Sequence, residues 1–204
     1  MKRGFSVREW VFVGLFGALW GAVEMTLGSV LHLIFPPIAD TFLVGLIMAS
    51  IGCLIALCGR VFVPRRGSIL LIGLITAVLK AFSLGGVKVG PIIGILAESL
   101  LMELGLLGSR RGSYAAFAVS GLLAVSWNFF HRFVMMGLLY GAGFFEVATR
   151  MVRDGSRLLG IREELIFLIL GVLLLIRMAA GAAAGAAAWG LAGQIQKRLR
   201  HEER

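Results

Sequence analysis

The amino-acid sequence predicts an all-α integral membrane protein, built as a single transmembrane domain over residues 1–204. Three observations favour this class. Apolar residues make up 59% of the chain and charged residues only 15%, whereas about 25% of the residues in a soluble domain are charged. The mean hydropathy is +0.94. The apolar residues also gather in long runs, and a bilayer core of about 30 Å requires roughly 20 such residues per helix.

Six transmembrane helices are expected from these runs and from the residues that interrupt them. The first run stops at Pro36-Pro37, because proline cannot continue a helix. The fourth begins at Pro91, a residue that suits a first helical turn. The start MKRGFSVREW lacks a small-residue cleavage site after a short apolar core, so we expect a retained first helix and not a signal peptide. The expected helices cover about residues 9–35, 38–59, 68–84, 91–108, 114–143 and 164–193.

The distribution of positive charge predicts the orientation. A net charge of +9 would also suit a nucleic-acid partner, but Lys and Arg of membrane proteins gather on the cytoplasmic side, and we expect no nucleic acid. Most of these residues lie before the first helix, in the second and fourth connections and in the tail. We therefore expect both termini to lie in the cytoplasm. The protein itself is expected in the cytoplasmic membrane of a bacterium or archaeon. Cys53 and Cys58, in one apolar run, are expected to be buried thiols.

The connection between the fifth and sixth helices, residues 144–164, alternates apolar residues and arginines at roughly helical spacing. It resembles an amphipathic helix at the outer interface that would cap a pocket. A solvated connector is an equally good interpretation. The last helix contains AAGAAAGAAAWG, residues 179–190, and such small side chains permit either tight packing inside the fold or a docking face on its surface.

Polar side chains from four expected helices share one level, in the outer half of the membrane, when depth is counted at 1.5 Å per residue. Charges inside a membrane are costly and are therefore functional candidates. Asn128, His131 and Arg132 share one helix face. The alternative is structural, with paired charges that hold helices together, and with Lys80 and His32 reaching toward the interface. The residues predicted to bind a substrate in an outward-facing pocket are Glu24, Lys80, Glu98, Trp127, Asn128, His131 and Arg132.

Glu103 and Arg177 are expected to lie deeper, near the middle of the membrane. An unpaired charge at that depth would be too costly. We therefore predict a structural ion pair, which these residues form with each other or with Glu24.

Catalytic signatures are missing from the sequence, which contains no HExxH, GxSxG or Walker A motif. On this basis no catalytic residue and no cofactor are predicted. His32, His131, Met135 and Met136 are possible metal or haem ligands in principle, but such methionines more often pack against apolar surfaces, and no metal site is predicted. Two alternatives stay open: an intramembrane enzyme acting on a lipid or prenyl substrate, and a structural membrane protein without a ligand.

Two stretches carry a resemblance to a known family. Ala18-Leu-Trp-Gly-Ala22 resembles the Ala-x-x-x-Ala docking motif of S components, the substrate-binding subunits of energy-coupling factor (ECF) vitamin transporters. The stretch GGVKVGPIIGILAESLLMELGL, residues 85–106, is similar to the Gly-Pro loop and fourth helix of S components assigned to thiamine or its hydroxymethylpyrimidine precursor. The chain departs from the related proteins at Glu98 and Glu103, where they often have an amide or a glycine-rich pattern.

The resemblance implies that the protein captures a vitamin outside the cell and performs no chemistry itself. Its first helix would dock on a transmembrane coupling subunit that two cytoplasmic ATPases drive, and the protein would then topple to release the vitamin inside. At 100° per residue, the proposed docking residues Gly14, Ala18 and Ala22 share one face of that helix.

The residues expected in the pocket suit a particular kind of ligand. Glu24 lies nearly opposite the docking face and, with Glu98, would suit a cationic or amine-bearing ring. Trp20 and Trp127 would stack on that ring. Arg132 would prefer a carboxylate or phosphate.

Overall fold

The computed structural model describes residues 4–34, 43–83, 89–108, 113–140 and 165–202, together with a few single residues between 141 and 164. The expected all-α class is confirmed for this part of the chain. Its helices are α1 (Val7–Ile34), α3 (Gly45–Phe62), α4 (Ser68–Ala81), α5 (Val89–Gly105), α6 (Tyr114–Tyr140) and α8 (Ile166–Glu202). The predicted amphipathic helix over 144–164 falls almost wholly outside the described residues.

Local chemistry explains where several helices begin and end. Ser6 and Glu9 form a capping box at the start of α1: the Ser6 backbone N–H donates to Glu9 Oε2 (2.7 Å), and the Glu9 backbone N–H donates to Ser6 Oγ (3.3 Å). Helix α8 continues well past the expected end at Gly193. The tail QIQKRLRHE consists mostly of strong helix formers, so nothing in it stops the helix.

Three of the described helices are long and apolar enough to cross a membrane. These candidate spans are Val7–Gly28, Gly45–Phe62 and Leu168–Ile195. Helix α4 has 14 residues, which corresponds to roughly 21 Å and falls short of a bilayer core of about 30 Å. The protein thus has the helices of a membrane protein.

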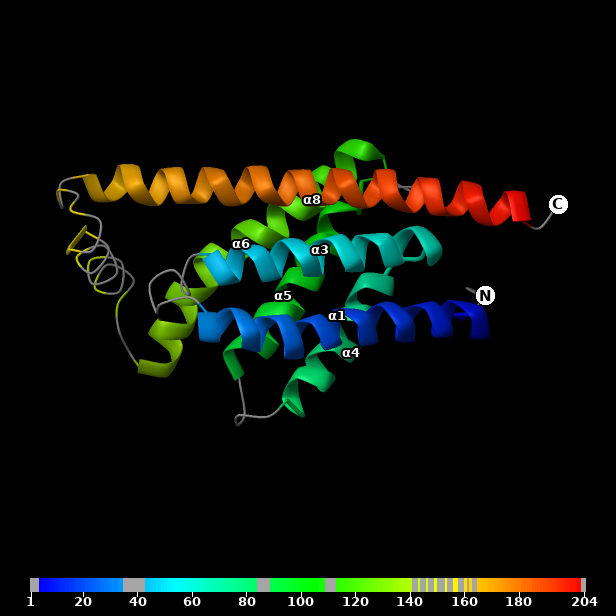
Figure 1. Ribbon diagram of the computed structural model, residues 1–204, viewed down its shortest axis with the longest axis horizontal. Helices are drawn as coiled ribbons and strands as arrows, with labels where there is room; N and C mark the ends of the chain where they lie inside the picture. The colour runs from blue at the N-terminus through cyan, green and yellow to red at the C-terminus, as the bar shows by residue number, and fades with distance from the viewer. Residues whose placement is uncertain are drawn as a thin grey trace.

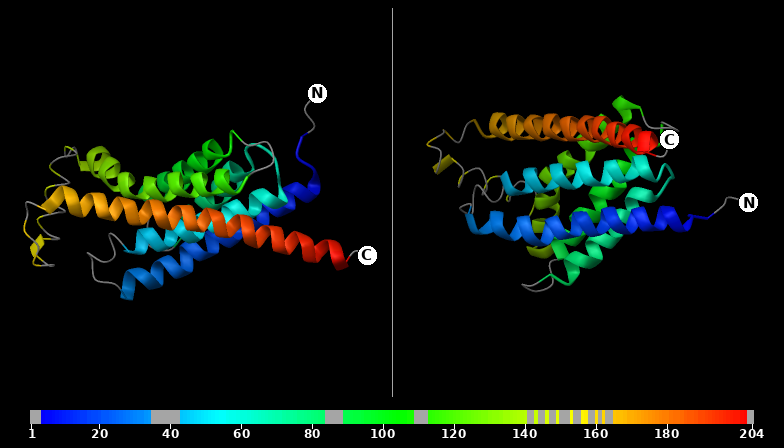
Figure 2. Two further views of the ribbon diagram at one scale, coloured as in Figure 1. Left: turned by 90° about the horizontal axis from the view of Figure 1, so that it is seen from above. Right: turned by 45° about the vertical axis from the view of Figure 1, so that its right-hand side comes forward.

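The helices form a bundle in which α1, α3 and α8 run roughly side by side, with α4, α5 and α6 crossing them obliquely (Figures 1 and 2). Helix α3 contacts each of the other five helices. The two chain ends lie at the same end of the bundle, which we call the terminal end. The opposite end is called the far end.

Glycine contacts bring α6 and α8 to backbone distance. A Cβ atom on Gly181 would overlap the Gly121 carbonyl oxygen and lie 2.9 Å from Val125 Cβ. A Cβ atom on Gly185 would overlap the Phe117 carbonyl oxygen. The small residues of the last helix therefore include a tight packing surface inside the fold, while Ala183 on the same helix is exposed.

The core combines apolar and sulfur-containing side chains. Trp20, Leu57, Ile69 and Phe117 are among its largest members and are at most 2% exposed. Cys53 and Cys58 are free buried cysteines, as expected. The Cys58 thiol donates to the Ala188 carbonyl (3.7 Å) and thereby links α3 to α8.

Substitution of Gly185 by Ala should destabilise the protein, because the added methyl group would meet backbone atoms that cannot yield cheaply. Overpacking of this kind costs about 1–3 kcal/mol, and each kcal/mol shifts the melting temperature of a chain of this size by about 2–4 °C. The measurement is the melting temperature in detergent. Gly190→Ala is the matched control on the same helix, since a Cβ atom there meets nothing within 4 Å; an equal loss in both variants would contradict the packing argument.

Candidate functional site

A buried ion pair joins α1 to α4. Lys80 Nζ donates to the Glu24 carbonyl oxygen (2.7 Å) and lies 3.3 Å from Glu24 Oε2. Lys80 is 7% exposed. One turn earlier on α4, the Thr76 hydroxyl donates to the Gly17 carbonyl (3.0 Å). These contacts require α1 and α4 to lie close together. Gly17 permits the close approach, since a Cβ atom at this position would lie only 2.8 Å from Ile75 Cβ.

A second set of contacts joins α5, α6 and α8 through one amide. Asn128 Nδ2 donates to Glu98 Oε1 at 3.5 Å, a long contact, and Asn128 Oδ1 accepts from Arg177 Nη1 at 3.0 Å. Glu98 is 5% exposed and Arg177 3%. Glu98 also lies within electrostatic range of both Glu24 and Arg177. The electrostatic interaction between Glu24 and Glu98 thus links the Lys80–Glu24 pair to the contacts of Asn128.

His131 lies one turn beyond Asn128, against the glycines of α5. A Cβ atom on Gly94 would lie 3.4 Å from His131 Nε2, and one on Gly90 would lie 4.0 Å from the same atom. The ring of Trp127 is tilted at 51° to the His131 ring, with 6.1 Å between their centroids. We call Glu24, Lys80, Glu98, Asn128, His131 and Arg177 the polar cluster.

Three of the five buried side-chain polar atoms that lack a hydrogen-bond partner among the described residues lie on α6; the other two are Trp20 Nε1 and Ser83 Oγ. Within the described residues, the unpartnered atoms of this helix are Ser126 Oγ, Trp127 Nε1 and His131 Nδ1. Nearly all buried polar groups in native proteins are satisfied, and an exception calls for a physical reason, such as a bound water, ion or ligand. These three atoms lie within six consecutive residues at the level of the polar cluster.

The small-residue face of α1 points away from the bundle. Ala18 and Ala22 are exposed, and a Cβ atom on Gly14 would meet nothing within 4 Å. Gly21, which adjoins this face, is buried against Leu79 of α4. Helix α1 therefore presents one packed glycine face and one open alanine face.

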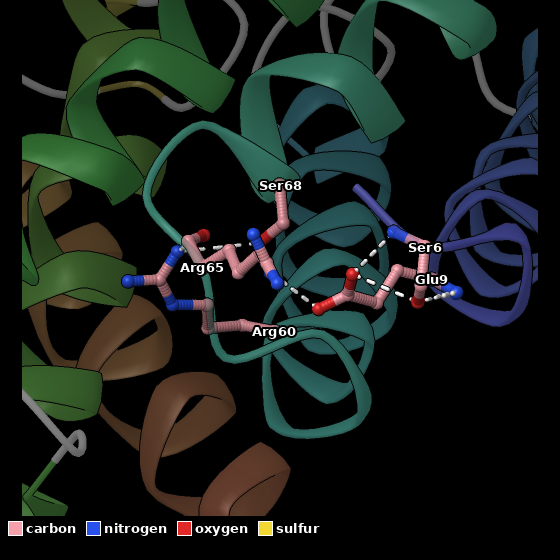
Figure 3. A network of polar contacts seen from close by, with 5 residues as sticks. All are labelled: Ser6, Glu9, Arg60, Arg65 and Ser68. Carbon is pink, nitrogen blue, oxygen red and sulfur yellow. Dashed lines mark hydrogen bonds and ion pairs between the residues drawn. The ribbon is translucent and has the colours of Figure 1, made fainter. Parts of the chain in front are cut away.

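A separate polar network lies near the terminal end (Figure 3). Glu9 accepts from Ser6 on one side and from Arg65 Nε on the other. Arg60 Nη1 donates to the Arg65 carbonyl oxygen and to Ser68 Oγ (3.2 Å). This network ties the start of α1 to the connection between α3 and α4.

The structure gives Glu103 another partner than the Arg177 of the predicted ion pair. Glu103 Oε1 lies 3.5 Å from Arg60 Nη1 and accepts from the Ile69 backbone N–H (2.9 Å). Glu103 lies on the last turns of α5, where it meets the start of α4, and a carboxylate at a helix N-terminus is favourably placed. Arg177 instead bonds Asn128 near the far half of the bundle.

The structure thus brings together Glu24, Lys80, Glu98, Asn128 and His131, with Trp127 beside His131. It adds Arg177, which we had assigned to a structural pair. Trp20, considered for stacking on a ligand, is 0% exposed and packs against Gly52 in the core. The side chains of Arg132 and His32 lie outside the described part of the structure.

Sequence reasoning missed Thr76 and gave Arg60 no role beyond topology. Thr76 carried no signal, because a threonine in an apolar helix commonly bonds its own backbone, as it also does here with Ile72 (3.0 Å). Arg60 did carry a signal. It is an arginine at the end of an apolar run, and Glu103 lies near the end of another apolar run at a similar level. The capping box was also visible as Ser6-x-x-Glu9.

Comparisons with known proteins identify no relative: no protein-family model, no curated protein and no solved structure matches the chain. Among the described residues, no group of three or more His, Cys, Asp and Glu side chains is arranged to hold a metal ion. The polar cluster presents hydrogen-bonding and charged side chains from α1, α4, α5, α6 and α8.

Loss of Lys80 should destabilise the protein strongly, since it leaves Glu24 buried without its cation. Removal of one partner of a buried pair typically costs about 3–5 kcal/mol. We expect Lys80→Met and Glu24→Gln each to lower the melting temperature in detergent, and the double variant to lose less than the sum. Lys197→Met, at an exposed position of α8, is the control. Strictly additive losses would mean that the two side chains do not interact.

Proposed function

We propose that the protein is a membrane-embedded substrate-binding component, the S component of an ECF-type importer, which captures a small water-soluble vitamin outside the cell. Thiamine or its pyrimidine precursor is the first candidate ligand. In this proposal the six-helix bundle is embedded in the cytoplasmic membrane and both termini lie in the cytoplasm. The common position of the chain ends supports it, because an even number of crossings returns the chain to its starting side.

The observation that carries the proposal is the set of unpartnered buried atoms on α6 beside the polar cluster. Trp127 Nε1 is a hydrogen-bond donor, and His131 Nδ1 donates or accepts according to its tautomer. A purely structural cluster would be expected to satisfy such atoms internally, as the Lys80–Glu24 pair is satisfied. A polar ligand seated at this level would supply the missing partners.

The charges at this level suit a ring that carries amino or cationic nitrogen. Glu98 contributes a buried carboxylate, and its contact with Asn128 at 3.5 Å is too long to be a strong hydrogen bond. A charged donor on the ligand would form a shorter and stronger bond with that carboxylate. The indole of Trp127 offers a face for a cationic ring.

The open face of α1 supports the second half of the proposal, docking on a transmembrane coupling subunit that two cytoplasmic ATPases drive. Gly14, Ala18 and Ala22 lie where another helix can approach closely. The exposed Leu15 and Leu19 flank them. No chemistry by this chain is required, since the energy for release would come from the ATPases.

Vitamin binding tests the proposal directly. We expect purified protein to bind thiamine or its pyrimidine precursor from a panel of vitamins, measured by isothermal titration calorimetry in detergent. Glu98→Gln and Asn128→Ala should weaken that binding by about tenfold or more, the factor that one buried charge-assisted hydrogen bond supplies. Thr26→Ala is the control, because this exposed hydroxyl bonds only its own helix, at the Ala22 carbonyl (2.7 Å).

Unchanged affinity for every vitamin in both variants would show that the polar cluster is not the binding site. Failure of the unaltered protein to bind any vitamin would favour the two alternatives, a lipid-directed enzyme or a structural protein.

Transport and binding should separate at the open face of α1. Ala18→Trp and Ala22→Trp are expected to abolish vitamin uptake into cells that carry the coupling subunit and ATPases, while leaving the dissociation constant in detergent unchanged. Leu175→Trp is the matched control, since it places the same side chain on an exposed and already bulky position of α8, away from this face. Joint loss of uptake and binding would mean that the face packs within the fold.

A further inference from the structure

The beginning of α3 lies directly against the amide of Asn128. A Cβ atom on Gly45 would lie 2.6 Å from Asn128 Oδ1, 3.4 Å from Cγ and 3.5 Å from Nδ2. Real Cβ atoms essentially never approach a heavy atom as closely as the first of these distances. The backbone of α3 at Gly45 therefore packs directly against the Asn128 amide, on a side that neither Glu98 nor Arg177 occupies.

The amide has little freedom to move away without losing its contacts. Nδ2 is directed at Glu98 on α5 and Oδ1 at Arg177 on α8. Rotation of the amide about its terminal torsion exchanges the donor and the acceptor, which would turn Oδ1 toward the Glu98 carboxylate and Nδ2 toward the Arg177 guanidinium. Both of those arrangements are repulsive. Contact with the Gly45 backbone thus helps to hold the amide in this one orientation.

We propose that Gly45 is a positioning residue of the binding site, where the absence of a side chain lets α3 hold the Asn128 amide between Glu98 and Arg177. The inference rests on the proposed function for its binding readout. It adds α3 to the site through its backbone alone.

A second glycine of the same region provides a matched comparison. A Cβ atom on Gly28 of α1 would lie 3.8 Å from Lys80 Nζ and 3.7 Å from Met48 Cε, which are ordinary van der Waals distances. A methyl group at position 28 therefore adds contact without displacing a polar atom. The two glycines border the same polar cluster and differ in whether a methyl group fits.

The overlap at position 45 involves the end of a side chain and not the backbone, so the amide should yield and the fold should persist. We expect Gly45→Ala to weaken thiamine binding about tenfold and to lower the melting temperature by a few degrees, because the displaced amide loses its contacts with Glu98 and Arg177. Gly28→Ala should leave the affinity unchanged. Once Asn128 is replaced by Ala, Gly45→Ala should cause no further loss, because no amide remains to be displaced.

The experiment measures thiamine affinity by calorimetry and melting temperature in detergent for Gly45→Ala, Gly28→Ala, Asn128→Ala and the Gly45→Ala/Asn128→Ala double variant. Non-additive effects, with the double variant no worse than Asn128→Ala, support the inference. Additive losses overturn it, as does equal loss of affinity in Gly28→Ala and Gly45→Ala. If the unaltered protein binds no vitamin, the proposed function fails, and the melting temperatures then decide the positioning role. In the Asn128→Ala background, Gly45→Ala should raise the melting temperature, because alanine lowers the conformational entropy of the unfolded chain.

Discussion

The bond between Lys80 and the main chain of α1 sets the constraint from which the arrangement of this bundle follows. A lysine buried between apolar helices must have its charge satisfied, and Lys80 achieves this twice, at the Glu24 carbonyl oxygen and at the Glu24 carboxylate. A helix carbonyl is reachable only if the two helices almost touch. Glycines at positions 17 and 21 permit that approach, and the register of α1 on α4 follows from it. With this register, Glu24 comes within electrostatic range of Glu98 on α5.

The two polar networks differ in how fully their polar groups are hydrogen-bonded. Near the terminal end, Glu103 and Glu9 each receive donors from both an arginine and a backbone N–H, and these contacts hold α1, α3, α4 and α5 together. In the far half, one asparagine amide stands between an acid and an arginine, and neighbouring polar atoms of α6 remain without partners. The contrast matters because burial penalises an unsatisfied polar atom equally in both places. In the proposed function, a bound ligand would supply the partners that this second network lacks.

The sequence predicted the fold class and the helices well, because long apolar runs broken by proline and charge depend only on local composition. Glu98, Asn128 and His131 were found together because 1.5 Å per residue places them at one depth. Partners were predicted poorly. Glu103 and Arg177 seemed suited to each other by depth, but pairing depends on which helices are neighbours, and α5 turns its last residues toward the α3–α4 connection. Gly45 had no signal at all, since its importance comes from a side chain 83 positions away that only the tertiary structure brings close.

The position of α3 has a consequence for how the protein is made. This helix touches every other helix of the bundle, yet its partner α8 is the last to be synthesised, and the thiol of Cys58 must wait for a carbonyl 130 residues further along the chain. Contacts so distant in sequence form late, because the intervening chain must be ordered before they can be made. During biosynthesis α3 therefore has a face covered only by lipid or by an assisting protein until translation is complete. Truncation before α8 would leave this face of α3 open, and such a fragment would be a natural substrate for membrane quality control.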